Sequence, residues 1–219
     1  MGPWPTSVCV TLRTTAALFI LGWCVTAHAE GPALRARPSV LLYGFEPYAE
    51  VDVNPTAAFV ERLAVGHPER RAAVLSVSPP DAMGALFELM QVRPKVIIGF
   101  GVRADVKGIE VNTAATNWIS LRTEGDPPYF GAIEPGLPAA VSVRAAWQRE
   151  LEAKVAASGA PVTLSTDAGL HACNLTFFQA LIHAEPGTRV LFIHVAPDLL
   201  VRSGLASQLT RLVESLLRP

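Results

Sequence analysis

The chain has 219 residues, of which 50% are apolar and 17% charged, with a formal net charge of −1. This composition excludes an intrinsically disordered protein, which would be poor in apolar residues and rich in charge. The absence of a strong positive charge argues against nucleic-acid binding, and three cysteines are too few for a disulfide scaffold.

The N-terminus has the layout of a secretory signal peptide. Arg13 is the only charged residue before Glu30, and residues 14–27 are almost wholly apolar. Ala27-His28-Ala29 supplies small residues at the −3 and −1 positions of a cleavage site. We therefore expect cleavage of residues 1–29 and export to the periplasm or the medium. An uncleaved anchor and a lipoprotein attached at Cys24 remain alternatives.

Removal of residues 1–29 would leave a single domain, residues 30–219. Cys9 and Cys24 leave with the signal, so Cys173 becomes the only cysteine of the mature chain. A single thiol cannot form an intramolecular disulfide, and it is either inert, paired between chains or chemically used. We expect no stable membrane anchoring after cleavage.

Strands and helices alternate along the rest of the chain. Short apolar runs predict strands at 39–45, 72–78, 95–101, 109–113, 162–165 and 189–195. Helices are predicted at 55–64, from Pro80 to about Met90, at 138–158, 173–183 and 205–217. In the second helix, we expect Met83, Leu86, Phe87 and Met90 to share the buried face.

This order predicts an α/β fold, a three-layer α/β/α sandwich with a mostly parallel twisted sheet, of the phosphorylase/hydrolase-like type. Residues 117–138 are rich in Gly, Pro and polar residues and are interpreted as a long loop or lid. Apolar residues between Trp118 and Phe130 would allow self-association into a homo-oligomer.

A candidate catalytic pair comes from two separate segments. Cys173 begins a predicted helix, where free backbone N–H groups and the helix dipole would stabilise a thiolate and an oxyanion. His194 lies near the end of a predicted strand and could act as general base and acid. The alternative is a buried structural cysteine and a hydrogen-bonded core histidine.

A metal site is a weaker interpretation. His171, Cys173 and His183 could contribute ligands, but His171-x-Cys173 has no second tight ligand pair. We therefore expect neither a metal nor a cofactor. Asn174-Leu-Thr176 matches a glycosylation sequon, which we discount because it lies beside the candidate site.

Four stretches, in order, resemble the pyroglutamyl peptidase I family, also called pyrrolidone-carboxyl peptidases or peptidase family C15. They are Tyr43-Gly-Phe-Glu-Pro-Tyr48 with Val53-Asn-Pro-Thr56, Pro94-Lys-Val-Ile-Ile-Gly-Phe-Gly101, Ala168-Gly-Leu-His-Ala-Cys-Asn174 and Phe192-Ile-His-Val-Ala-Pro197. Each motif alone is weak, whereas their joint order and spacing is fairly specific.

The resemblance implies a role for each matching residue. Cys173 matches the family's nucleophile and His194 its partner, while Phe45 and Tyr48 match aromatic residues that line the pyroglutamyl pocket. Asn54 matches a residue that orders the pocket loop. His171 stands where the family usually has an aromatic residue near the substrate. The implied reaction hydrolyses an N-terminal pyroglutamyl bond through an acyl-enzyme, without a cofactor.

The family's catalytic glutamate is the main departure. Aligning its E-R-x-A-x-N segment on Asn112 gives Lys107-Gly-Ile-Glu-Val-Asn112, so Lys107 takes the glutamate position. Glu110 lies three positions later, and on a strand an odd offset would point to the opposite face. Glu110 could therefore replace the glutamate only if a bulge or a shifted alignment reversed its direction. Asp105 has the matching parity and is a second candidate for the third catalytic residue.

Other departures lie near the expected substrate. The family's A-R-I-P-D-N-E-G segment is reduced to Ser120-Leu-Arg-Thr-Glu-Gly125, and the expected arginine aligns with about Ile119 rather than with Arg122. We expect an exported cysteine peptidase that acts on peptides with a blocked, pyroglutamyl N-terminus. The alternatives are a catalytically impaired pseudo-enzyme that binds peptides or small amides, and a related cysteine hydrolase of different acyl specificity.

Overall fold

The computed structural model describes residues 38–48, 52–122, 128–199 and 204–218. They belong to one compact unit, Ala36–Pro219. The predicted signal peptide lies outside the described residues. Within the described part of the chain, no helix is long and apolar enough to cross a membrane.

A six-stranded sheet with the order β2-β1-β3-β10-β4-β9 forms the centre of this unit. The strands are β1 (Val40–Phe45), β2 (Arg70–Leu75), β3 (Val96–Val102), β4 (Ile109–Asn112), β9 (Val162–Ser165) and β10 (Arg189–Val195). β2, β1, β3 and β10 run parallel, and β4 is antiparallel to β10 but parallel to β9. The prediction of a mostly parallel α/β fold is confirmed.

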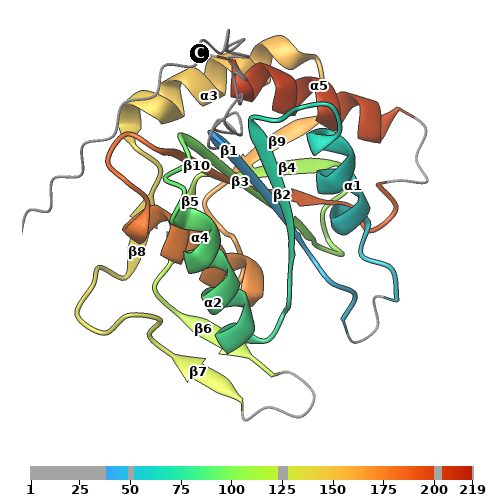
Figure 1. Cartoon of the computed structure of the whole chain (residues 1–219). Coiled ribbons are helices and arrows are strands. Elements are labelled where there is room, and N and C mark those ends of the chain that lie inside the picture. Colours follow the sequence, from blue (N-terminus) through green and yellow to red (C-terminus); the bar gives the residue numbers. More distant parts are fainter. Residues whose placement is uncertain (1–37, 49–51, 123–127, 200–203, 219) are drawn as a thin grey trace, which may run out of the picture. The chain divides into compact units, whose positions relative to one another are not determined.

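Helices cover both faces of the sheet (Figure 1). They are α1 (Pro55–Ala64), α2 (Pro79–Met90), α3 (Ala145–Ser158), α4 (Ala172–His183) and α5 (Leu205–Leu217). α2 packs with α4 on one face, and α3 packs with α5 on the other, where α1 also contacts β1, β2 and β3. The result is the expected arrangement of helix, sheet and helix layers.

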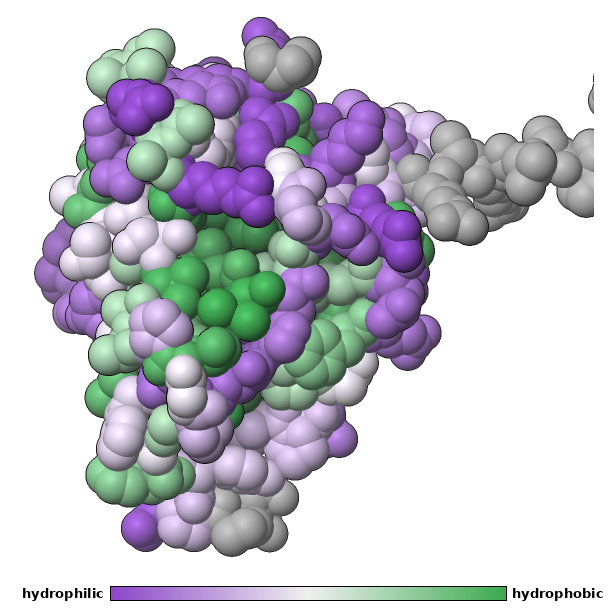
Figure 2. Space-filling view, turned by 90° about the vertical axis from the view of Figure 1, so that its left-hand side faces the viewer, coloured by the Kyte–Doolittle hydropathy of each residue, from purple (hydrophilic) through white to green (hydrophobic). Residues whose placement is uncertain are grey.

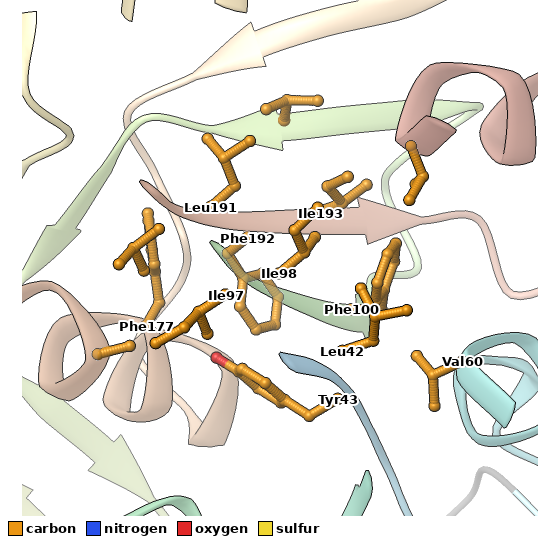
Figure 3. Close-up of a cluster of buried hydrophobic side chains, with 14 of the residues drawn as sticks. Leu42, Tyr43, Val60, Ile97, Ile98, Phe100, Phe177, Leu191, Phe192 and Ile193 are labelled. Atoms are coloured by element: carbon orange, nitrogen blue, oxygen red, sulfur yellow. The ribbon is translucent and has the colours of Figure 1, made fainter. Parts of the chain in front are cut away.

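The alternation of side chains along each strand fills the two layers of the core. Tyr43 of β1 is directed toward Phe177 of α4, and its neighbour Leu42 points the other way, toward Val60 of α1 (Figure 3). Phe192 of β10 contacts both Tyr43 and Phe177, with ring centroids 6.1 and 5.9 Å apart. The side chains two positions after Tyr43 and Phe192 on these strands therefore point to the face of the sheet that α4 covers.

The segment between β4 and α3 differs most from the sequence prediction. The helix predicted from Pro138 begins at Ala145, because residues 140–142 form the strand β8 (Ala140–Ser142), which pairs with β5 (Ala114–Thr116). Its predicted end is confirmed, since Gly159 adopts the left-handed conformation with φ 61°. The strand predicted at 72–78 is β2 and begins earlier, at Arg70.

The predicted loop at 117–138 contains a hairpin of β6 (Ile119–Leu121) and β7 (Tyr129–Gly131). Residues 123–127 of that stretch lie outside the described residues. Trp118 and Phe130 are 40% and 75% exposed and stack edge-on at this hairpin, and the prediction of self-association stays a prediction. In α2, Phe87 is 37% exposed and Leu89 is buried instead, so the predicted buried face is rotated.

A second apolar feature lies at the edge of the core. Figure 2 shows a hollow of hydrophobic surface bordered by hydrophilic side chains, on the side of the molecule where α3 begins. A cavity of about 280 Å³ between β8, the first turns of α3 and the start of β10 has Val143, Trp147, Leu181 and Val190 among its lining residues.

Candidate active site

The candidate site lies at the carboxyl edge of the parallel strands, on the face that α4 covers. Tyr43 and Phe45 of β1, and Phe192 and His194 of β10, alternate onto this face. His194 pairs in register with Gly101 at the end of β3. This edge is where α/β sheets place ligand sites, because successive loops open there.

Cys173 is the second residue of α4, and His171 is the residue that precedes the helix. At this position the backbone N–H groups of the first turn have no acceptor within the helix. The Sγ atom of Cys173 lies against Gly101, since a Cβ built on that glycine would come within 2.7 Å of it. The nucleophile candidate therefore lies one strand away from His194.

The thiol is protonated in the free protein. Burial raises the pKa of Cys173 to about 12, although its own backbone N–H and the positive charge of Arg103 act in the opposite direction. Stabilisation of a thiolate by the helix start stays a prediction, and desolvation of the partly buried thiol opposes it.

The imidazole of His194 is neutral in the free protein. His194 is 2% exposed, and burial together with the charge of Arg103 lowers its pKa to about 4, while Asp167 and Asp105 act in the opposite direction. Its Nδ1 atom lies 2.7 Å from Oδ1 of Asn112. Between the described Cys173 and His194 side chains the structure forms no hydrogen bond.

The candidates for a third catalytic residue occupy different places. Oε1 of Glu110 lies 3.9 Å from Nδ1 of His194, and Glu110 is the cross-strand partner of His194. Asp105 is exposed and pairs with Arg103 at 2.8 Å rather than with the imidazole. Lys107 is exposed, lies in the bend before β4 and does not line the cavity.

The parity argument that started from Lys107 does not hold. It required Lys107 and Glu110 to lie on one strand, but β4 begins at Ile109. Within β4 the alternation places Glu110 and Asn112 on the same face, toward His194. Glu110 therefore faces the site without any bulge.

A cavity of about 620 Å³ opens in front of these groups. Its lining includes every substrate-binding candidate from the sequence, together with the candidate catalytic pair: Phe45, Tyr48, Asn54, His171, Cys173 and His194. Arg103 and Arg122 also line it. Burial and the nearby thiol raise the pKa of Tyr48, so its phenol stays neutral.

Asn54 holds the loop that carries the two aromatic residues. Its Oδ1 accepts hydrogen bonds from the backbone N–H (3.1 Å) and Oγ1 (2.7 Å) of Thr56, as the cap of α1. Its Nδ2 donates to the backbone oxygen of Glu46 at 3.2 Å, and Thr56 Oγ1 accepts from the N–H of Phe45. One buried amide thus joins the first turn of α1 to the segment from Phe45 to Tyr48.

Three residues of this site were not singled out from the sequence as parts of it: Gly101, Asn112 and Arg103. Gly101 and Arg103 were noted only within the apolar strand and the changed turn that follows it, residues 101–105, and Asn112 only as an alignment anchor. The signal that could have found Asn112 is its spacing of two from Glu110 on a strand, which puts both side chains on one face. Arg103 follows β3 directly, where the carboxyl edge begins.

Two weaker interpretations can be compared with the structure. Asn174 is fully buried and donates 2.9 Å hydrogen bonds to the backbone oxygens of Thr116 and Trp118, which leaves no room for a glycan. Among the described residues, no group of three His, Cys, Asp or Glu side chains is arranged to hold a metal ion.

Comparison with known proteins places this architecture in a family. A family model described as pyroglutamyl peptidase matches residues 38–202. The pyrrolidone-carboxylate peptidase of Gloeobacter violaceus is 33% identical over 169 residues, which cover 71% of this chain and 80% of that protein. The protein of the same name from Thermococcus litoralis is 31% identical over 175 residues, covering 74% and 79%.

The fold agrees with this assignment. The crystal structure of pyrrolidone carboxyl peptidase from Thermus thermophilus superimposes with a TM-score of 0.69 at 28% identity, covering 81% of this chain and 98% of that one. The pyrrolidone carboxyl peptidase from Thermococcus litoralis gives a TM-score of 0.67 at 26% identity, covering 81% and 90%. The chain belongs to the pyroglutamyl peptidase family, peptidase family C15.

Proposed function

We propose that this protein is an exported cysteine peptidase that removes N-terminal pyroglutamyl residues from peptides, with Cys173 as nucleophile and His194 as general base and acid. One observation carries the proposal: in a member of this family, Cys173 and His194 line the same cavity as the aromatic residues Phe45 and Tyr48. Membership of the family supports the reaction class.

The cavity suits a small, uncharged lactam ring. Phe45 and Tyr48 offer flat apolar surface, and a pyroglutamyl ring presents one N–H and one carbonyl that need a few polar partners. The hydrogen bonds of Asn54 keep the backbone beside these rings in one conformation. A preformed pocket of this kind binds substrate with little loss of conformational entropy.

The chemistry draws only on side chains of this chain and on water. Sγ of Cys173 attacks the carbonyl carbon of the pyroglutamyl–peptide bond, forming the C–S bond, while Nε2 of His194 takes the thiol proton. His194 then gives that proton to the leaving amine as the C–N bond breaks. Water next attacks the thioester, giving up a proton to Nε2, and the C–S bond breaks with return of the proton to sulfur.

The start of α4 supplies the charge stabilisation for this sequence. The carbonyl oxygen becomes negative in the tetrahedral intermediate, and the first-turn N–H groups around Cys173 are free to donate to it. The positive end of the helix dipole acts in the same direction. A helix terminus too weak to ionise the buried thiol at rest still stabilises charge that appears only during the reaction.

Release of 7-amino-4-methylcoumarin from its pyroglutamyl derivative tests the proposal. We expect turnover by the wild-type protein, none by Cys173→Ala, and none with the alanyl derivative, which has a free amine and no lactam. Equal release by wild type and Cys173→Ala would remove Cys173 from the mechanism. No release by wild type would exclude this activity.

A second candidate is a pseudo-enzyme that binds the same peptides without turnover. Cys173 and His194 are both neutral and form no hydrogen bond with each other. This favours the pseudo-enzyme, because neither group is activated in the free protein. Calorimetric titration with a pyroglutamyl dipeptide separates the two: binding with an intact peptide after prolonged incubation supports the pseudo-enzyme.

A screen of peptides with other N-terminal acyl groups tests the alternative in which His171 and Arg122, both lining the cavity, alter specificity.

Export is the second part of the proposal. It rests on the apolar segment and the Ala27-His28-Ala29 sequence, as no described residue bears on it. Expression in a Gram-negative host, followed by cell fractionation and N-terminal sequencing, should give Glu30 as the first residue of a periplasmic protein. Recovery of the chain in the cytosol with residues 1–29 attached would overturn it.

A further inference from the structure

The hydrogen-bond partner of the histidine is an amide rather than a carboxylate. Nδ1 of His194 lies 2.7 Å from Oδ1 of Asn112, whereas the carboxylate oxygen Oε1 of Glu110 is 3.9 Å away. The side chains of Asn112 and His194 are 0% and 2% exposed, so water does not compete for this contact. A histidine that acts as base needs such a partner to fix its ring orientation.

The orientation of the Asn112 amide is determined by its other partners. Its nitrogen, Nδ2, lies 3.1 Å from Oε1 of Glu110 and 2.9 Å from the backbone oxygen of Asp167, and both of these atoms accept hydrogen bonds. Only the opposite amide orientation would turn the nitrogen toward His194, and it would set Oδ1 against two acceptors. Asn112 therefore presents its oxygen to the imidazole.

This arrangement fixes the tautomer of His194. Because Oδ1 of Asn112 can only accept, the proton of the neutral imidazole resides on Nδ1, which donates to it. The lone pair is then on Nε2, the atom that must take the thiol proton of Cys173. The wrong tautomer would present an N–H to the thiol and could not act as a base.

Glu110 acts on the histidine through Asn112. Its Oε1 accepts from Nδ2 of Asn112 and also from Nη1 of Arg103 at 3.2 Å. Nη1 of Arg103 donates in addition to the backbone oxygen of Asp167 at 2.8 Å, the same oxygen that accepts from Asn112. The guanidinium and the carboxylate together hold the amide in place.

We propose that Asn112 is the positioning residue for His194 in this protein, fixing the proton on Nδ1, and that Glu110 and Arg103 hold Asn112 rather than contacting the histidine. The inference rests on the proposed cysteine-peptidase function. It assigns the role of orienting the imidazole, which the alignment seemed to leave vacant at Lys107, to a residue of β4.

A neutral partner has a consequence that a carboxylate would not have. The charged groups that face His194 are Arg103, Glu110, Asp105 and Asp167, and Arg103 is paired with each of the other three. An amide oxygen adds no negative charge to this set. Replacing Asn112 by Asp adds a negative charge in direct contact with Nδ1 of His194, which favours the protonated imidazolium.

The first experiment reads the tautomer in the wild-type protein. The ¹⁵N shifts of the His194 ring in the wild-type protein, assigned by comparison with His194→Gln, report which nitrogen carries the proton. We expect a protonated Nδ1 and an unprotonated Nε2 at pH 7. The opposite tautomer would overturn the proposal, and this readout is independent of any activity toward pyroglutamyl substrates.

The second experiment compares turnover of the pyroglutamyl coumarin substrate by three variants. Asn112→Ala should lose roughly 10- to 100-fold in kcat with little change in KM, because only the orientation of the base is lost. Glu110→Gln keeps an oxygen for Nδ2 and should lose less than Asn112→Ala. Asn112→Asp should retain turnover and move the acid limb of the pH profile upward.

A matched control is Asn117→Ala. Asn117 is also buried, and its amide holds the backbone at Glu134 and Leu137 rather than the histidine. Its kcat should stay close to that of wild type. A greater loss in Glu110→Gln than in Asn112→Ala, or a kcat of Asn112→Ala equal to wild type, would overturn the proposal. A wild-type protein without turnover but with the expected tautomer would overturn the proposed function alone.

Discussion

The sulfur atom of Cys173 lies directly against the backbone of Gly101, so closely that no side chain fits between them. A Cβ on Gly101 would come within 2.7 Å of Sγ and within 3.0 to 3.1 Å of the ring of Phe192. The end of β3 therefore forms the surface against which Cys173 packs, and its second glycine is required by close approach rather than by backbone conformation.

Gly101→Ala should consequently displace Cys173 and lower turnover strongly. Overpacking at such a site costs about 1–3 kcal/mol of stability, so a folded but impaired protein is expected. The matched control is Gly84→Ala in α2, where an added Cβ meets nothing within 4 Å. It should be neutral or stabilise the protein by about 0.5–1 kcal/mol. Steady-state kinetics and thermal unfolding of both variants check this, and full activity in Gly101→Ala would contradict it.

Asn54 joins the cap of α1 to the segment from Phe45 to Tyr48. The roles of its side-chain oxygen, Oδ1, and its side-chain nitrogen, Nδ2, can be tested separately. Asn54→Ala removes both functions and should cost about 1 kcal/mol of stability and raise KM, because the segment from Phe45 to Tyr48 loses its tether. Asn54→Asp keeps the acceptor for Thr56 but loses the donor to the backbone oxygen of Glu46.

Asn54→Asp should therefore retain the stability of wild type while KM still rises. Chemical denaturation and Michaelis–Menten analysis give the two quantities independently. A KM at the wild-type value in both variants would show that the tether does not shape the pocket.

The buried His194 should make the protein less stable in mild acid. Its pKa is lowered from 6.5 to about 4, so between these values the unfolded chain binds a proton that the native protein does not. The free energy of unfolding that depends on a neutral His194 is fully present above pH 6.5 and is lost as the pH falls toward 4. The loss amounts to about 2–3 kcal/mol by pH 4.5.

His194→Gln removes this titration. The difference in unfolding free energy between pH 7 and pH 4.5, measured with urea, should be smaller in the variant than in wild type by that amount. Equal differences in the two proteins would mean that His194 is not held neutral.

The Cys173 thiol should react slowly in the native protein. Its pKa is raised from 9.0 to about 12, so at pH 8 the folded protein holds far less thiolate than the unfolded chain. We expect iodoacetamide to alkylate Cys173 at least about tenfold more slowly in buffer than in guanidinium chloride, followed by mass spectrometry of the Cys173 peptide. Faster labelling in the native state would contradict the raised pKa.

Arg70 and Glu214 join β2 to α5 through a bidentate ion pair, with N–O distances of 2.6 and 2.8 Å. The Arg70 side chain is only 6% exposed, and it also donates to the backbone oxygen of Leu63. Glu214→Gln should cost about 1–2 kcal/mol, because a nearly buried guanidinium loses one of its two charged partners and keeps only Glu69, at 3.3 Å. This pair holds the carboxyl-terminal helix to the edge of the sheet.

The control for that pair is the exposed one between Arg93 and Glu185, whose side chains are 73% and 52% exposed. Glu185→Gln should leave stability within about 0.5 kcal/mol of wild type. Urea unfolding of the two variants gives the comparison, and equal effects would show that burial does not strengthen the Arg70–Glu214 pair.

Local signals in the sequence determined much of the fold. Asn54-Pro55 placed the start of α1, the apolar runs placed β3 and β10, and Gly159 placed the end of α3, because caps, prolines and buried strands act through adjacent residues. The prediction for residues 138–144 failed because β8 forms by pairing with a strand more than twenty residues earlier, and such pairing leaves little local pattern.

The motifs around Cys173 and His194 pointed to the cavity that the structure shows, since sequence order alone puts strand ends and helix starts at one edge of a sheet. Only the tertiary structure decided the protonation and the hydrogen-bond partners of that pair. Desolvation raises the pKa of the Cys173 thiol, and the antiparallel register of β4 against β10 brings Asn112 to His194. Both effects depend on atoms that are distant in the sequence and meet only in the folded chain.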